Sequence, residues 1–294
     1  MIRTALLLVL ALAASPAAAQ LVPLSDLGSG TYLGFEGGLY EKGMNAPPAD
    51  HLAAGLARAA LIAPLDGEGR PDPQGRIVLL SIGMSNTTQE FCGAQSPGPC
   101  TSWSFVGQAL ADPEVSRTIA FANGARGGQA ASTWESPSQP NYVRIRDEVL
   151  ARAGLTEAQV QVAWVKVANG RPAISLPDSN ADALRLVAQM GSIARALRVR
   201  YPNIRIAYFS SRIYAGYATT TLNPEPYAYE SGFAVKWLIE AQVEQMRGGT
   251  IDPRAGDLHP DLSAPWIGWG AYLWANGTEP RSDGLIWERR DFAN

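Results

Sequence analysis

The segment RIVLLSI, residues 76–82, runs directly into GMSN, residues 83–86, and this junction decides how the chain folds. A continuous run of β-branched and leucine side chains, without polar alternation, is typical of a strand buried on both faces of a parallel sheet. Gly83 permits a tight turn after that strand, and Ser85 then stands where a helix begins. The junction therefore predicts a strand–turn–helix unit with a serine at the start of its helix.

Segments of the same apolar character recur further along the chain, at residues 117–122, 160–167 and 204–210. Helical patterns follow these segments, at residues 141–153, 178–200 and 227–247. Strands that alternate with helices predict βαβ units, and hence an α/β domain with a parallel sheet covered on both faces. Ligands of such sheets bind beyond the carboxyl ends of the strands, so the residues after each strand form the candidate site.

The N-terminus has the features of an export signal: Arg3, a short alanine-rich apolar run and small residues at 17–19. An uncleaved N-terminal anchor is the alternative. No later stretch reaches the roughly 20 apolar residues that a membrane-spanning helix needs. We expect a signal peptide at residues 1–19, an N-terminal extension and connector at 20–75 that wraps the domain, and the α/β domain at 76–294. The protein is then secreted or periplasmic.

The charge of the chain bears on which partners it can bind, and its cysteine content bears on disulfide bonding. The formal net charge is −3 and no Lys/Arg cluster is present, which argues against nucleic acid, whose phosphates need a basic surface. Cys92 and Cys100 lie in a stretch rich in Pro and Gly. An even cysteine count and an oxidising destination predict a disulfide between them. Free thiols or metal ligands are the alternative, but no other Cys or His is close in sequence.

Glycines and polar residues follow the first three predicted strands. Ser85 comes after the first, where free backbone N–H groups at a helix start favour a developing oxyanion, although serine is also a common helix cap. The glycines of NGARGGQ, residues 123–129, let a backbone N–H approach a substrate. Asn169 follows the third strand and offers an amide donor, or is an ordinary turn residue. Their joint occurrence at one edge of the sheet indicates a single site.

Three of these segments resemble blocks I, II and III of the SGNH hydrolases, also called GDSL-like esterases and lipases: LLSIGMSN (79–86), NGARGGQ (123–129) and VKVANG (165–170). The resemblance extends from Arg76 to the C-terminus. It implies a flavodoxin-like three-layer α/β/α sandwich and the hydrolysis of esters through an acyl-enzyme. It implies no cofactor, because this chemistry needs neither a metal nor a nucleotide.

The resemblance also assigns roles to individual residues. Ser85 is the nucleophile, and its own N–H is one oxyanion donor. Gly128 supplies a second donor through its backbone N–H, and Asn169 supplies a third through its side chain. Met84 departs from the pattern, because the family usually has an acidic residue directly before the serine.

A larger departure concerns the base that activates the serine. The family carries Asp-x-x-His in block V, and a serine hydroxyl is a poor nucleophile without an adjacent base. This chain has two histidines, His51 and His259. His51 precedes the first strand and is expected to be structural. His259 is the candidate base, but Gly256 stands where the Asp belongs. Since residues 284–294 resemble the approach to block V, we expect the base to lie beyond Asn294.

We therefore expect a secreted serine ester hydrolase of the carboxylesterase or carbohydrate acetylesterase type, acting on a small-molecule, lipid or acetylated-glycan ester. The alternative is an inactive carbohydrate-binding or scaffold protein on the same fold. The missing base and the Trp-rich last fifty or so residues favour it, although such aromatics more often cover a sheet. Arg212, Tyr214 and Tyr217 follow the fourth predicted strand and are expected either to line the substrate pocket or to pack.

The predicted disulfide can be tested on the exported protein. Thiol alkylation without reductant should leave Cys92 and Cys100 unmodified, and alkylation after reduction should add two groups, because only free thiolates react. Intact mass spectrometry measures both states. Two alkylated thiols in the non-reduced sample would contradict the pairing.

Overall fold

The computed structural model describes residues 21–93 and 99–292. The predicted signal peptide, residues 1–19, lies outside the described residues.

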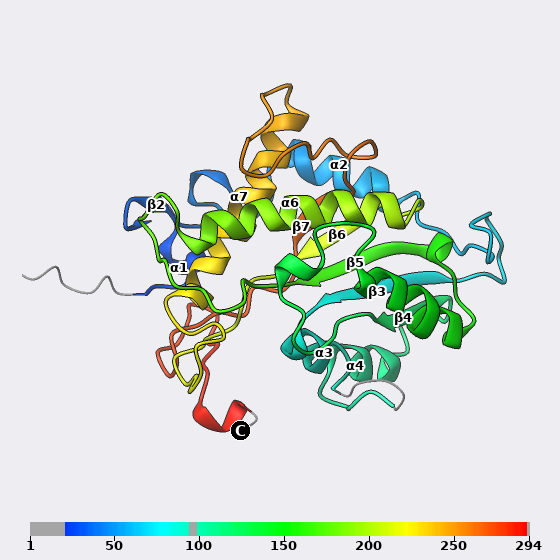
Figure 1. Ribbon diagram of the computed structural model, residues 1–294, viewed down its shortest axis with the longest axis horizontal. Coiled ribbons are helices and arrows are strands. Elements are labelled where there is room, and N and C mark those ends of the chain that lie inside the picture. Colours follow the sequence, from blue (N-terminus) through cyan, green and yellow to red (C-terminus); the bar gives the residue numbers. More distant parts are fainter. Residues whose placement is uncertain (1–20, 94–98, 293–294) are drawn as a thin grey trace, which may run out of the picture.

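A five-stranded parallel sheet forms the centre of the fold, with strand order β4-β3-β5-β6-β7 (Figure 1). Its strands are β3 (Ile77–Gly83), β4 (Ile119–Asn123), β5 (Val160–Lys166), β6 (Ile206–Phe209) and β7 (Trp266–Trp269). Taken in chain order, the arrangement is 2-1-3-4-5, the doubly wound order of flavodoxin-like folds. The expected flavodoxin-like α/β fold is confirmed.

Strand β7 was not expected from the sequence. Its four residues, WIGW, are too few and too poor in β-branched side chains to show a strand pattern. The segment becomes a strand because it pairs with β6, with Ile206 opposite Trp266 and Phe209 opposite Trp269. Tertiary pairing thus completes the sheet at an edge that local propensity leaves undefined.

Helices cover both faces of the sheet. One face carries α3 (Ser85–Cys92) and α4 (Phe105–Ala111), where Phe91 stacks on Trp164 of β5 with ring centroids 5.9 Å apart. The same face carries α2 (Ala49–Ala59), where His51 stacks on Trp266 of β7 at 4.6 Å.

The opposite face carries the crossover helices after β4, β5 and β6. These are α5 (Pro140–Arg144) with its continuation through the π-helical turn Ile145–Leu150 and the 3-10 turn Ala151–Ala153, α6 (Asp182–Arg200) and α7 (Tyr227–Met246). The connection from β3 to β4 adds a strand on one side of β3, and the later connections add β5, β6 and β7 on the other side. Because such crossovers are right-handed, α3 and α4 fall on one face and the later helices on the other.

The N-terminal segment packs onto α7 as part of the main hydrophobic core. It contains α1 (Leu24–Leu27), the hairpin of β1 (Thr31–Tyr32) and β2 (Phe35–Glu36), and a 3-10 turn at Glu41–Gly43. Tyr32 stacks on Phe233 of α7 at 5.8 Å. Lys236, also on α7, is 2% exposed and donates hydrogen bonds to the carbonyl oxygens of Glu36 (3.2 Å), Gly37 and Tyr40 (3.1 Å). One buried ammonium therefore fastens this segment to the domain.

Replacing Lys236 with Met should lower the free energy of unfolding by about 3 kcal/mol, because the buried carbonyl groups of Gly37 and Tyr40 and the part-buried carbonyl of Glu36 lose their donor. Lys42→Met is the matched control, since Lys42 lies exposed in the same segment and its loss should change stability by less than about 0.5 kcal/mol. Urea denaturation measures both variants. Equal stabilities would show that Lys236 does not anchor the segment.

Candidate functional site

The carboxyl ends of β3, β4 and β5 meet at one edge of the sheet. Ser81 of β3 is paired with Asn123, the last residue of β4, and Gly83 is paired with Lys166, the last residue of β5. The chain continues from β3 to β4 on one side and later returns to β5 on the other, so this is the topological switch point. Ligands of doubly wound sheets bind in the crevice that opens there.

Ser85 is the first residue of α3, and its side chain is exposed. The helix start is held by Thr87, whose hydroxyl accepts from the Met84 N–H (3.2 Å) and donates to the Lys166 carbonyl (2.6 Å). The Ser85 hydroxyl forms no hydrogen bond to a described residue. Ser85 is therefore not the cap of this helix, and its hydroxyl faces solvent at the positive end of the helix dipole.

Gly83 makes the close approach of β3, α3 and β5 sterically acceptable. A Cβ atom at this position would lie 2.2 Å from the Lys166 carbonyl oxygen and 2.4 Å from the Thr87 hydroxyl. Real contacts are never that short, so a side chain here would push α3 away from β5. The glycine that the sequence suggested for a turn is required by this packing.

Gly128 lies on a turn that bridges the ends of β3 and β5. The Arg126 N–H donates to the Gly83 carbonyl (3.1 Å), and the Ala131 N–H donates to the Ala168 carbonyl (3.0 Å). Between these two anchors Gly128 has φ +77°, is exposed, and has no atom within 4 Å of the place a Cβ would occupy. Its N–H donates to no described group. The turn thus presents an open backbone donor beside the strand that leads to Ser85.

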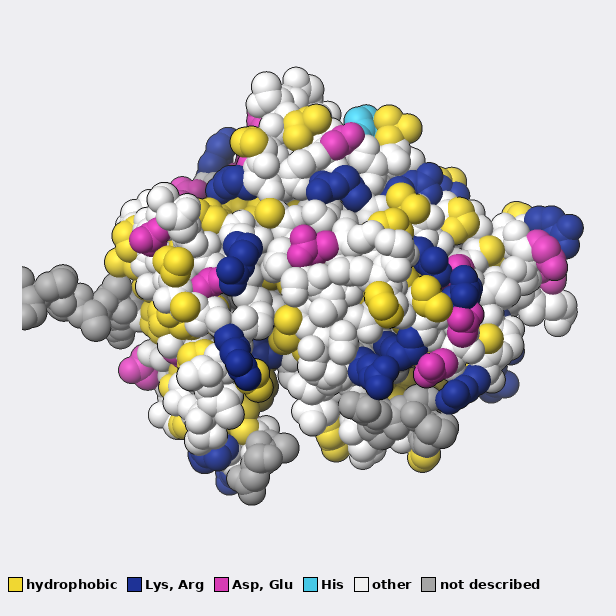
Figure 2. Space-filling model, in the orientation of Figure 1, with side chains coloured by type: hydrophobic (Ala, Val, Ile, Leu, Met, Phe, Trp, Pro, Cys, Tyr) yellow, Lys and Arg dark blue, Asp and Glu magenta, His cyan; other side chains and the backbone are white. Residues whose placement is uncertain are grey.

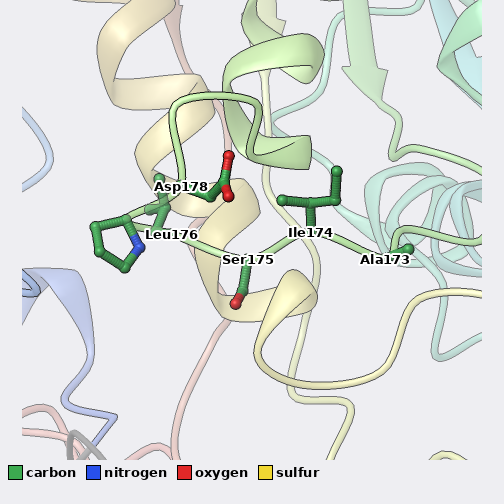
Figure 3. A pocket seen from close by; sticks show the side chains of 6 residues that line it. Ala173, Ile174, Ser175, Leu176 and Asp178 are labelled. Atoms are coloured by element: carbon green, nitrogen blue, oxygen red, sulfur yellow. The ribbon is translucent and has the colours of Figure 1, made fainter.

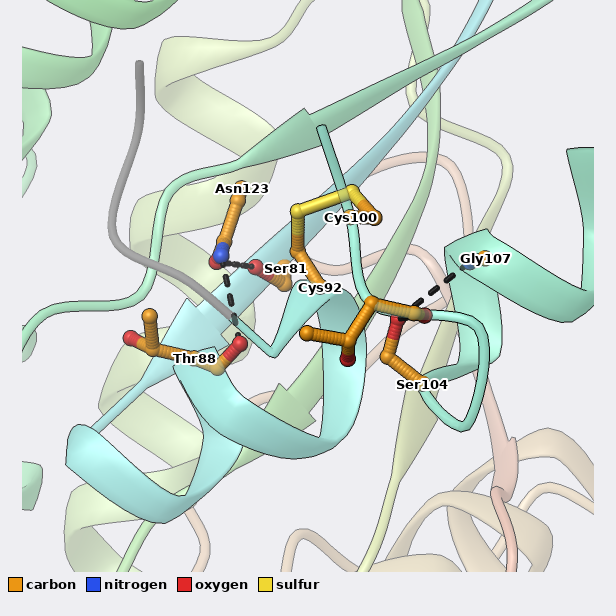
Figure 4. Close-up of a disulfide and its surroundings, with 8 residues drawn as sticks. Ser81, Thr88, Cys92, Cys100, Ser104, Gly107 and Asn123 are labelled. Carbon is orange, nitrogen blue, oxygen red and sulfur yellow. Dashed lines mark hydrogen bonds between the residues drawn. A yellow bond between two sulfur atoms is a disulfide. The ribbon is translucent and has the colours of Figure 1, made fainter. Parts of the chain in front are cut away.

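A polar relay holds the start of this turn against α3 (Figure 4). The Ser81 hydroxyl donates to Asn123 Oδ1 (2.8 Å) and accepts from the Ala125 N–H (3.3 Å). The Asn123 amide donates to the Thr88 carbonyl on α3 (3.3 Å). Because Ser81 and Asn123 are paired in the sheet, these hydrogen bonds link β3, β4 and α3 at the edge of the sheet where α3 begins with Ser85.

The disulfide between Cys92 and Cys100 is formed, as the sequence predicted, with Cα atoms 4.5 Å apart (Figure 4). It joins the last residue of α3 to the segment that leads into α4. Phe91, Cys92 and Val106 form a small separate core under this connection. The staple therefore stabilises the helix that carries Ser85 from its far end.

Asn169 is brought to the same edge, but its side chain is directed to α6. It is 5% exposed, and its amide nitrogen donates to Gln189 Oε1 of α6 (3.0 Å). In the other amide orientation the oxygen accepts from Arg185 Nε (3.2 Å) and the nitrogen donates to the Asp182 carbonyl (3.1 Å). Either orientation bonds α6. We expected this amide to face the Ser85 hydroxyl, and the structure bonds it to the helix on the opposite face of the sheet from α3.

Neither histidine lies at the carboxyl edge. His259 is exposed in the loop before β7, where Pro260 pairs with Ala264 and the Asp261 carbonyl accepts from Arg198 near the end of α6 (2.9 Å). This loop is at the amino end of a parallel strand, so it lies at the opposite edge of the sheet from Ser85. In Figure 1 the orange segment before β7 is at the top and α3 is at the bottom.

His51 is buried under β7, as expected for a structural residue. Its Nε2 bonds the Ile267 carbonyl at 2.9 Å, and burial lowers the pKa of its ring. The ring is therefore held between α2 and the sheet, away from the candidate site.

Four charged side chains lie near the site: Lys166, Glu90 and Glu225, which the sequence did not single out, and Arg212, which it offered as a residue that lines the pocket or packs. Lys166 is 1% exposed at the end of β5 and donates to both carboxylate oxygens of Glu90 on α3 (2.7 and 2.5 Å). Burial lowers the pKa of Lys166, while Glu90 raises it. Burial likewise lowers the pKa of Arg212, while Glu90 and Glu225 raise it. The one available signal was the lysine near the end of the largely apolar segment VQVAWVKV, residues 160–167.

The loops after β6 and β7 border the candidate site on the side opposite α3 and α4. Tyr214 packs on Trp274 with ring centroids 6.1 Å apart, and the Tyr217 hydroxyl donates to the Trp287 carbonyl (3.0 Å). The Arg171 N–H donates to the Leu222 carbonyl (3.2 Å), which joins the loop after β5 to the loop after β6. Figure 2 shows a notch in the surface between these loops and the side that carries α3 and α4.

A shallow open pocket lies in the loop after β5, lined by residues 173–178 (Figure 3). Glu230 of α7 is 1% exposed behind it and accepts from the Leu176 N–H at 3.1 Å and from the Tyr32 hydroxyl at 3.3 Å. Burial raises the pKa of Glu230 to about 7. Asp182 and Glu225 act in the same direction by charge repulsion.

Glu230 should make the stability depend on pH. Its carboxyl binds a proton more tightly in the folded than in the unfolded chain, so its full contribution is present below about pH 4.5 and is lost as the pH rises through about 7. Between pH 5 and 8 we expect a loss on the order of 2 kcal/mol that Glu230→Gln removes. Glu244→Gln, at an exposed position on the same helix, should keep the slope. Thermal melts across this range would contradict the assignment if both variants behaved alike.

Within residues 21–93 and 99–292, no group of three or more His, Cys, Asp and Glu side chains is arranged to hold a metal ion. In the same residues, no helix combines the length and the hydropathy needed to cross a membrane.

Comparison with known proteins leaves the chain without an assigned family. No protein-family model matches it. No curated protein matches it either. Among solved structures, the chain is similar to a protein of Arabidopsis thaliana whose X-ray structure was determined at 1.6 Å resolution. The two share 12% sequence identity with a TM-score of 0.39, over 72% of this chain and 91% of the plant protein.

Proposed function

We propose that this chain is an exported serine ester hydrolase with Ser85 as its nucleophile. The observation that carries the proposal is the exposed Ser85 hydroxyl at the first residue of α3, beyond the carboxyl end of β3. It lies at the switch point of the sheet, next to a turn with an open Gly128 N–H. A nucleophile and an oxyanion donor at one strand edge are two of the three groups that acyl transfer by a serine uses, and the third is a base.

In this reaction the Ser85 oxygen bonds to the ester carbonyl carbon, and the bond from that carbon to the alcohol oxygen breaks. The alcohol leaves with a proton, and water then hydrolyses the acyl-enzyme. The Ser85 and Gly128 N–H groups would hold the negative oxygen of each tetrahedral intermediate, and one such donor typically contributes about 3 kcal/mol. Asn169 can serve as a third donor only if its amide leaves α6.

The proton of Ser85 needs an acceptor, and neither His51 nor His259 is at this edge. Without an adjacent base, deprotonation depends on solvent, and a serine hydroxyl then reacts slowly. We therefore expect the 294-residue chain to react slowly with ester-like reagents, and faster as the pH rises. The orientation of the two backbone donors does not depend on the base, so selectivity for Ser85 should remain.

The rival function, carbohydrate binding without turnover, receives little support from the aromatic residues of the C-terminal region. Trp274 is 1% exposed and donates to Glu225 (2.9 Å). Trp266 is 6% exposed beneath α2. Trp269 and Trp287 are partly buried, and their indole N–H groups donate to the carbonyls of Leu39 (2.5 Å) and Leu273 (2.7 Å). Tryptophans that pack in this way favour a covering role over stacking on a sugar, so we prefer the hydrolase.

The Cys92–Cys100 disulfide supports an oxidising compartment, because such bonds rarely persist in the cytosol. An exported ester hydrolase would meet small-molecule, lipid or acetylated-glycan esters there. The notch beside α3 is open, so the size of the acyl or alcohol group does not by itself select among these three classes of ester.

A fluorophosphonate probe tests the nucleophile, because it reacts with activated serines. We expect slow labelling of the chain, and a loss of about 100-fold or more in Ser85→Ala, since the attacking oxygen is gone. Ser132→Ala is the matched control, because Ser132 is exposed in the loop after Gly128 and should not react. His259→Ala should also leave the labelling rate unchanged.

In-gel fluorescence and peptide mass spectrometry identify the labelled residue. Undiminished labelling in Ser85→Ala, or no labelling above that variant in the parent chain, would refute the proposed function.

A further inference from the structure

Arg212 is the third residue after β6, and its backbone is fixed against α7. Its N–H donates to the Ser231 hydroxyl (3.0 Å), which donates in turn to the Ala228 carbonyl (2.6 Å). The side chain is partly buried, and its Nε atom is buried without a hydrogen-bond partner in the part of the chain that the structure describes. No ion pair or hydrogen bond joins its guanidinium to a described residue. A guanidinium donates only, so the buried Nε–H of Arg212 is a donor without an acceptor.

The two carboxylates near Arg212 are bonded to other groups. Glu90 pairs with Lys166. Glu225 accepts from the Ala215 N–H (2.8 Å), the Trp274 indole (2.9 Å) and the Tyr229 N–H (2.9 Å). Both are close enough to raise the pKa of Arg212 by their charge, but neither forms an ion pair with it. Lys166 and Glu90 are therefore the one ion pair among these four groups, and neither Arg212 nor Glu225 belongs to one. The Glu225 carboxylate has three hydrogen-bond donors, whereas the buried Nε–H of Arg212 has no acceptor among the described residues.

A buried donor without an acceptor lowers the stability of the folded chain. Such a group in a folded protein calls for an explanation, and a missing ion or ligand is a common one. The position of Arg212 suggests which ligand. It lies beyond the carboxyl end of β6, next to the pair formed by Lys166 and Glu90. Glu90 belongs to the helix that Ser85 begins, so the guanidinium and the nucleophile belong to the same edge of the sheet.

We propose that Arg212 binds a carboxylate of the substrate, and that the ester which this site accepts carries such a group on its acyl or alcohol part. The proposal rests on the function proposed above. A guanidinium matches the two oxygens of a carboxylate in a bidentate pair. A carboxylate brings a single negative charge to the guanidinium, whereas a doubly charged phosphate would be repelled more strongly by the nearby Glu90 and Glu225.

Binding to a Ser85→Ala protein tests the proposal without turnover. The probes are monomethyl succinate, which carries a carboxylate, and dimethyl succinate, its neutral counterpart. We expect the monoester to bind about tenfold more tightly, because a charged hydrogen bond to a buried donor is worth roughly 1.5 kcal/mol or more. Adding Arg212→Gln should abolish the difference, and adding Arg212→Lys should retain part of it. Isothermal titration calorimetry measures the binding of both esters to the Ser85→Ala protein and to its two double variants.

Thermal stability distinguishes a binding role from a structural one. Arg212→Gln should melt at or above the temperature of the parent protein, because it removes the buried Nε–H donor that has no acceptor. Lys166→Met is the contrasting variant and should melt lower, because it leaves Glu90 without its partner. A lower melting temperature in Arg212→Gln would overturn the proposal.

Three other results would also overturn it: equal binding of the two esters, a preference that survives Arg212→Gln, and tighter binding of inorganic phosphate than of monomethyl succinate. Fluorophosphonate labelling separates this inference from the proposed function. Carboxylate binding that needs Arg212, in a chain whose Ser85 does not label, would support the anion site and refute the esterase. Labelling at Ser85 without any carboxylate preference would refute only the anion site.

Discussion

The pairing of β3 with β4 on one side and β5 on the other determines where every residue of the candidate site lies. Since all three strands are parallel, their carboxyl ends emerge at one edge, and the segments carrying Ser85, Gly128 and Asn169 emerge with them. Gly83 allows this pairing to continue to the last residue of β3, because any side chain there would meet the Lys166 carbonyl. The turn of Gly128 is then hydrogen-bonded to both neighbours. Loss of this register would separate the nucleophile from its proposed oxyanion donor.

Buried charge is the second constraint at the same edge. Lys166 and Glu90 neutralise each other and connect β5 to α3, so the helix that presents Ser85 is held by an ion pair as well as by Thr87 and the disulfide. Arg212 has no such partner. The Lys166–Glu90 ion pair holds the strand and the helix in place, while the buried Nε–H of Arg212 beside it has no acceptor. A rigid site with a free donor is the arrangement expected where a ligand binds.

Most of the fold could be predicted from local pattern. The apolar runs at β3, β4, β5 and β6 and the helical periodicity of α6 and α7 are long enough to be recognised without tertiary information. The strand β7 was not predictable, because WIGW carries no period and depends on β6 for its hydrogen bonds. The packing of the N-terminal segment on α7, through Tyr32 and the bonds from Lys236, was equally hidden, since the two segments are about two hundred residues apart.

By itself the sequence determined the strand–turn–helix unit at Ser85, the glycine-rich turn after β4 and the pairing of two cysteines, because each depends on residues close together in the chain. Only the tertiary structure decided the direction of the Asn169 amide, which α6 captures through Gln189, and the place of His259 at the opposite edge. It alone matched Lys166 with Glu90 and left Arg212 without a partner. These outcomes depend on which helices pack against the ends of the strands, and a side chain's partner across a sheet cannot be inferred from its neighbours in sequence.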